Sequence, residues 1–179
     1  MMAGTKSTSP LAGLGILLAV IVVIAPFVGL ATLLGVHDSW AAFLFLLCWT
    51  MVEKGSIENF PRALIGALVG ASAGALFALL PLWLGETGAI AFLGVVLVLT
   101  YMLIMGWLPI AVNTTTMIFL TVGTIPHVAS GADIPDVFTA IALGAVYFGA
   151  IGLIGAQISK RRAAGHAAAA AGETQPVGI

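Results

Sequence analysis

Long runs of hydrophobic residues alternate with short polar breaks along most of this 179-residue chain. A helix that crosses a bilayer needs about 20 consecutive apolar residues. The pattern therefore predicts an all-α membrane protein with six transmembrane helices, of which the second is short and the fifth is interrupted by polar residues. The expected helices cover residues 11–34, 40–52, 60–83, 89–107, 109–125 and 134–158, with a loop at 126–131.

The composition indicates a protein surrounded by lipid. Hydrophobic residues make up 61% of the chain and charged residues only 7%, whereas a soluble domain carries roughly 25% charged residues. We therefore expect a cytoplasmic N-terminus at residues 1–10 and a transmembrane domain at 11–158. The Ala- and Gly-rich residues 159–179 are expected to form a flexible cytoplasmic tail.

The basic residues predict the orientation of the chain in the membrane. With six helices, all of them fall in segments on one side, and a count of five or seven would divide them between the two sides. Because cytoplasmic loops carry an excess of Lys and Arg, both termini are expected in the cytoplasm, and the protein is expected in an inner (plasma) membrane. The residues concerned are Lys6, Lys54, Arg62, Lys160, Arg161 and Arg162.

The third and sixth predicted helices begin alike. Residues 59–62 (Asn-Phe-Pro-Arg) correspond to residues 133–136 (Asp-Ile-Pro-Asp), and Gly70 corresponds to Gly144. Asn and Asp favour helix N-caps, and proline favours the first turn. Three helices in each half would give a 3+3 inverted repeat, an architecture that recurs in transporters. The alternative is that two helices rich in small residues align by chance.

Small residues also form faces on these two helices. Gly66, Gly70 and Gly74 are spaced by four, and Gly144, Gly149 and Gly152 make a similar face. Such faces let membrane helices approach closely, which predicts a homo-oligomer within the lipid bilayer or a pairing of the third and sixth helices. Ordinary packing within one chain is the alternative.

The candidate functional residues lie on the second and fifth helices. Uncharged polar groups without a deeply placed ionisable residue argue against a proton relay. They predict a channel or facilitator for a small uncharged polar solute, such as a urea- or amide-like molecule, selected by pore width and hydrogen-bond geometry. Glu53 and Glu58 are a possible cytoplasmic gate, or else belong to a solvated loop. The expected pathway residues are Asn113, Thr114, Thr116, Trp49 and Thr50.

Other functions find little support in the sequence. Cys48 is the only cysteine, so a disulfide framework and a cysteine-based metal site are excluded. Residues 70–74 read Gly-Ala-Ser-Ala-Gly, but they lie in mid-helix, where a nucleophile elbow cannot form. We expect no enzyme, no cofactor, no metal and no nucleic acid partner. The alternative function is a non-transporting membrane scaffold or accessory subunit, which a dry, packed centre between the second and fifth helices would favour.

Two short motifs carry a resemblance to a known family. Residues 39–43 read Ser-Trp-Ala-Ala-Phe, and Pro135 is followed at 142–149 by Ala-Leu-Gly-Ala-Val-Tyr-Phe-Gly. In these motifs, in size and in helix number, the chain resembles the YcdZ-like bacterial inner-membrane proteins, a family of unknown function. The charged segment 53–59 stands where that family has a Gly-rich stretch. The resemblance implies fold and location, and it brings no substrate.

Overall fold

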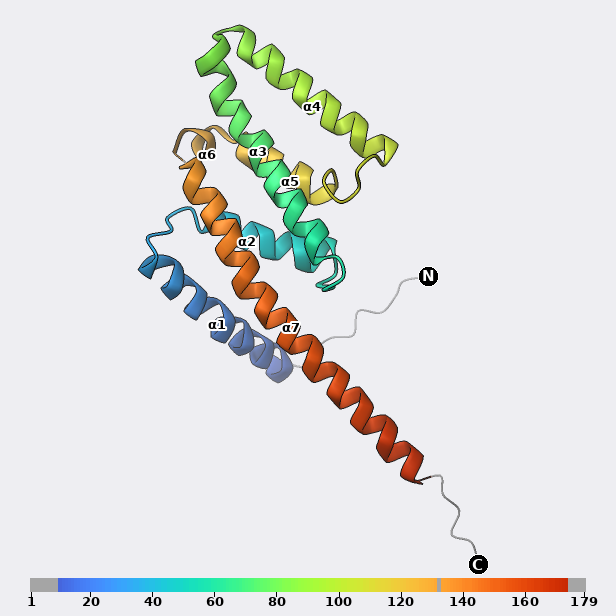
Figure 1. Ribbon diagram of the computed structural model, residues 1–179. Coiled ribbons are helices and arrows are strands. Elements are labelled where there is room, and N and C mark those ends of the chain that lie inside the picture. Colours follow the sequence, from blue (N-terminus) through green and yellow to red (C-terminus); the bar gives the residue numbers. More distant parts are fainter. Residues whose placement is uncertain (1–9, 132, 174–179) are drawn as a thin grey trace, which may run out of the picture.

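The computed structural model describes residues 10–131 and 133–173, which form helices joined by short turns (Figure 1). No strand occurs in these residues, so the prediction of an all-α fold is confirmed. In chain order the elements are α1 (Pro10–Leu33), α2 (Trp40–Leu47), the π-helical turn η1 (Cys48–Val52), α3 (Phe60–Leu84), α4 (Thr87–Met105), α5 (Thr114–Gly123), α6 (Pro126–Gly131) and α7 (Ile134–Glu173).

Four of the described helices are long and apolar enough to cross a membrane, and they lie in α1, α3, α4 and α7. The continuous helix formed by α2 and η1, Trp40–Val52, and the helix α5 are apolar but shorter. With a rise of 1.5 Å per residue, they cover roughly 20 and 15 Å of a hydrocarbon layer about 30 Å thick. Length and composition thus support a membrane protein with four full crossings, and six crossings stay a prediction.

Three predicted boundaries were wrong. The fifth helix begins at Thr114 rather than at residue 109, because the preceding turn contains Leu108 with a φ of 49° and ends at the cap residue Asn113. The expected loop after it contains the short helix α6, which opens on a proline whose ring favours the first helical turn. The last helix continues past residue 158 to Glu173 through an Ala-rich segment, and Ala is the strongest helix former.

The short helices pack against long helices from the other part of the chain. α2 lies on α7, and α5 lies on α3, while α1 contacts α7 and α4 contacts α3 (Figure 1). The positions at which these helices begin are also related by one fixed spacing in the sequence. The step along the sequence from Trp40 to Thr114, where α2 and α5 begin, equals the step from Phe60 to Ile134, where α3 and α7 begin. We call this step the helix offset.

The glycine faces account for these close contacts. A Cβ atom on Gly70 would overlap the backbone oxygen of Thr116 in α5, and one on Gly144 would come within 2.7 Å of the Ala42 Cβ in α2. The helix offset also relates Gly70 to Gly144 and Ala42 to Thr116. Because the two glycine faces are covered by other segments of the same chain, they explain intramolecular packing, and the predicted homo-oligomer no longer has them as its basis.

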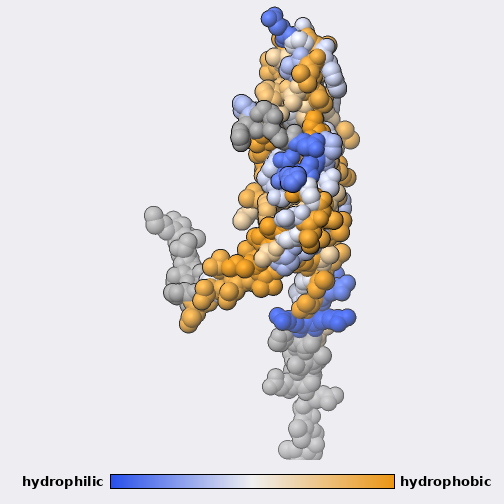
Figure 2. Space-filling view, turned by 90° about the vertical axis from the view of Figure 1, so that its left-hand side faces the viewer, coloured by the Kyte–Doolittle hydropathy of each residue, from blue (hydrophilic) through white to orange (hydrophobic). Residues whose placement is uncertain are grey.

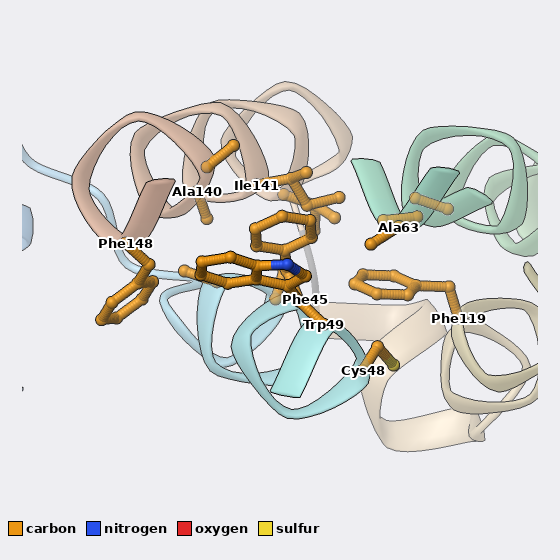
Figure 3. Packing of buried hydrophobic residues seen from close by; sticks show 14 of the residues in the cluster. Phe45, Cys48, Trp49, Ala63, Phe119, Ala140, Ile141 and Phe148 are labelled. Atoms are coloured by element: carbon orange, nitrogen blue, oxygen red, sulfur yellow. The ribbon is translucent and has the colours of Figure 1, made fainter. Parts of the chain in front are cut away.

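The centre of the molecule is apolar. Figure 3 shows Phe45, Cys48 and Trp49 of α2 and η1 between Ile141 of α7 on one side and Phe119 of α5 on the other. All five side chains are buried. The outer faces of α1 and α4 instead present large hydrophobic side chains, and the surface in Figure 2 is largely hydrophobic. A hydrophilic band marks α7 where Lys160, Arg161 and Arg162 are exposed.

Candidate functional site

Buried polar side chains gather where η1 ends and where α3 and α5 begin. The buried members are Glu53, Asn113, Thr115 and Thr116, and Arg62 from the first turn of α3 joins them. We refer to these five residues as the polar cluster. Among the described residues, these are the buried polar side chains together with one ion-pair partner, and they include two of the predicted pathway residues.

Asn113 connects the start of α5 to α3. Its backbone is extended, and its side-chain oxygen accepts a hydrogen bond from the Thr116 N–H, while the Thr116 hydroxyl accepts one from the Asn113 N–H. This reciprocal pair is a capping box. The Asn113 amide nitrogen donates to the carbonyl oxygen of Arg62 at 3.1 Å, and also to the carbonyls of Pro109 and Ile110. The amide is therefore fully used by protein groups, and it is only 1% exposed.

Glu53 is held at the end of the π-helical turn. Its carboxylate lies 3.4 Å from the Arg62 Nε, and the Glu53 side chain is 6% exposed whereas that of Arg62 is 44% exposed. The backbone then turns sharply at Lys54, whose φ of 55° lies in the left-handed region. Glu58, the other predicted gate residue, is exposed and is not part of this ion pair. The structure thus does not bring the two glutamates of the predicted gate together.

Thr115 and Arg62 are the members of the polar cluster that were not predicted from the sequence as functional residues. The Thr115 side chain is fully buried beside the Cys48 thiol, a weak hydrogen-bonding group, and its hydroxyl has no stronger partner among the described residues. The sequence did contain a signal for Thr115. Thr115 and Phe119 are four residues apart, so they share one face of the helix, and the burial of an aromatic residue on that face implies the burial of Thr115. A thiol satisfies a hydroxyl only weakly, so beyond the contact with Cys48 this position retains hydrogen-bonding capacity that the fold does not use.

The remaining predicted pathway residues are scattered. Thr114 and Thr50 are exposed, and the Thr50 hydroxyl donates to the Leu46 carbonyl of its own helix. The Trp49 indole is buried on the α7 side, where it packs on Gly152 and donates to the Ser56 carbonyl at 2.9 Å. Among the five predicted residues, Asn113 and Thr116 are the pair joined by hydrogen bonds.

A second polar connection lies at the start of α7, and we call it the acidic clamp. The Asp136 carboxylate accepts hydrogen bonds from the backbone N–H groups of His37 and Asp38 at 2.7 and 2.6 Å. The Asp38 carboxylate in turn accepts from the Asp133 N–H and from the Trp40 indole. The helix offset relates Arg62 to Asp136, so the polar cluster and the acidic clamp each tie the entry of one short helix to the first turn of its long partner.

No protein-family model matches the chain, and no similar protein was found among curated proteins or solved structures. The resemblance to the YcdZ-like family therefore stays a prediction. In the described ranges, no group of three His, Cys, Asp or Glu side chains is placed to hold a metal ion.

Proposed function

We propose that the protein is a membrane facilitator that passes a small, uncharged polar solute between two inverted halves. In this proposal α1–α3 and α4–α7 are the halves, the two short helices cross with their adjoining turns, and both termini face the cytoplasm. The carrying observation is that each short helix packs on the long helix of the other half, and that the same helix offset relates the two pairs. Paired interrupted helices of this kind are the best sequence and structural pointer to a transport site.

The packing favours a moving facilitator over a permanently open pore. The contact between η1 and α5 is filled by Cys48, Phe119 and neighbouring apolar side chains (Figure 3). A solute would pass only when the two halves slide or rotate against each other, a kind of movement that occurs between packed helices. The polar cluster and the acidic clamp are the connections that such a movement would release.

The charges favour a neutral solute. Within the described residues, Glu53 is the buried side chain among the acidic and basic residues, and it is paired with Arg62 at the end of the helices. Asn113 and Thr116 use their hydrogen-bonding groups on the backbone. The Thr115 hydroxyl is the buried group with capacity left for a solute.

Flux into proteoliposomes tests the proposal with urea, acetamide and glycerol as solutes. We expect flux above that of empty liposomes for at least one of them, and a clear reduction in Thr115→Val, which keeps the shape of the side chain and removes its hydroxyl. The matched control is Thr121→Val, because the exposed Thr121 hydroxyl only donates to the Met117 carbonyl of its own helix. Flux that is absent, or equally reduced in both variants, would contradict the proposal.

The dry centre favours a second candidate, a non-transporting scaffold or accessory subunit. A scaffold needs no pathway, and the apolar packing between η1 and α5 offers none in this arrangement. Cross-linking distinguishes the two candidates. Cysteines placed on η1 and α5 and joined by a short linker would abolish the flux of a facilitator, whereas a scaffold would show no flux before or after joining.

A further inference from the structure

We infer that an apolar groove between the start of α3 and the middle of α7 binds one anionic phospholipid, with an acyl chain in the groove and the phosphate on Lys160 and Arg161. The groove leaves room for about 430 Å³. We call it the α3–α7 groove. The lining residues on which the inference depends are Phe60, Ala145, Val146, Gly149, Ala150 and Leu153.

The chain covers the equivalent place in the other half with its own residues. The helix offset relates Phe60 to Ile134 and Ala145 to Ala71. Ile134 and Ala71 line a second crevice on α3 and α7, which α6 also lines with Val128, and this crevice leaves room for only about 40 Å³. A small, covered crevice in one half therefore corresponds to a large groove in the other.

The turn that corresponds to α6 leaves the α3–α7 groove uncovered. The helix offset relates Val128 to Lys54 and Ala129 to Gly55. Lys54 and Gly55 are exposed, their φ angles of 55° and 63° lie in the left-handed region, and neither residue lines the groove. The space that α6 covers in the other half is thus left here for a molecule from outside the chain.

The position of the groove defines the apolar part of that molecule. The groove lies along the apolar span 134–164 of α7, and its described lining contains no charged side chain. Val146 and Leu153 line it and are 73% and 50% exposed, so the groove opens to the surroundings of the helix. In a bilayer those surroundings are acyl chains, because a span of this length crosses the hydrocarbon layer.

The basic residues at the end of α7 define the charged part. Lys160 lies about two turns beyond Leu153, which places it on the groove face about 10 Å farther along the helix. Arg161 lies about three turns beyond Ala150 and continues the same face. Arg162, about two and a half turns beyond Leu153, is on the opposite face. All three are exposed, and basic residues beside membrane helices bind anionic headgroups. Binding here does not depend on the transport proposal.

Native mass spectrometry of the purified full chain tests the inference. Phosphatidylglycerol and phosphatidylcholine with identical acyl chains are added in turn to the delipidated protein in detergent. We expect one phosphatidylglycerol per chain to stay bound, and phosphatidylcholine to be retained roughly tenfold or more weakly, because it has no net charge for the two basic residues. Equal retention of the two lipids would indicate an ordinary surrounding lipid and would overturn the inference.

A pair of variants tests the headgroup contact. Arg161→Gln should weaken the retention of phosphatidylglycerol roughly fivefold. Arg162→Gln is the matched control, because it removes the same charge from the opposite face of α7 and should leave retention unchanged. Equal losses in the two variants would mean a general attraction between the basic segment and anionic lipid, and no site on the groove face.

A second pair tests the groove itself. Ala150→Trp places a large side chain in the groove and should abolish the retention of phosphatidylglycerol, whereas Val98→Trp, on a face of α4 that is 58% exposed, should not alter it. Full retention by Ala150→Trp would refute the groove as the acyl-chain site. A dimer that carries no lipid and that Ala150→Trp separates would identify a second copy as the occupant, and this result would also overturn the inference.

Discussion

Replacing Asn113 by Ala should strongly weaken the attachment of α5 to α3. The substitution removes the capping oxygen of α5, which costs about 1 kcal/mol, and the hydrogen bond to the Arg62 carbonyl, which contributes about 0.5–1.5 kcal/mol. It also leaves a void beside Gly66, over which the Asn113 amide packs. Allowing for that void, we expect a loss of roughly 2–4 kcal/mol in the free energy of unfolding.

Cys48 provides the assay. It is the only cysteine, and it is fully buried beside Thr115, where η1 meets α5. A maleimide dye that fluoresces on reaction with a thiol therefore reports when α5 and η1 separate during heating in detergent. At roughly 2–4 °C per kcal/mol for a chain of this size, the midpoint should fall by roughly 4–16 °C.

A second substitution separates the two roles of Asn113. Asn113→Asp retains an oxygen that can accept from the Thr116 N–H, and a negative charge is favourable at a helix N-terminus. It also replaces the amide N–H groups by an oxygen that faces three carbonyls. We expect Asn113→Asp to melt at least as low as Asn113→Ala. A midpoint near that of the wild type would refute the importance of the bond to Arg62.

Three further predictions concern packing, the acidic clamp and orientation. Gly70→Ala should lower the same melting midpoint, because the new Cβ meets the α5 backbone, while Gly94→Ala, with open space around it, should leave it unchanged or raise it. Asp136→Ala removes two backbone hydrogen bonds and should speed hydrogen exchange at residues 37–38, measured by mass spectrometry, with exchange in α4 unaltered. In a Cys48→Ser background, Ser159→Cys should react with a membrane-impermeant thiol reagent only from the cytoplasmic side, and labelling from the other side would contradict the predicted orientation.

Membrane residence and the long helices depend on the residues of single segments, and both were predicted from the sequence. An apolar run either reaches the thickness of a bilayer or does not, and the starts of α3 and α7 at Phe60 and Ile134 follow from a proline in the first turn. Asn59 stands at the N-cap of α3 as expected, although its side chain makes no capping hydrogen bond. The sequence also drew attention to Asn113 as a polar residue in an apolar segment. It did not predict that Asn113 caps the N-terminus of α5.

The partners of these residues were decided by tertiary structure alone. A glycine face has the same sequence whether it meets another copy or the chain's own short helix, and only the fold placed Gly70 on α5 and Gly144 on α2. Likewise, an amide in an apolar segment must find partners, but the sequence does not say whether these are a solute or a carbonyl 51 residues away. The sequence by itself therefore indicated the lipid surroundings and the long helices, because these are properties of single segments. The tertiary structure decided which polar groups are already satisfied and which pockets stay open, because both depend on contacts between segments far apart in the chain.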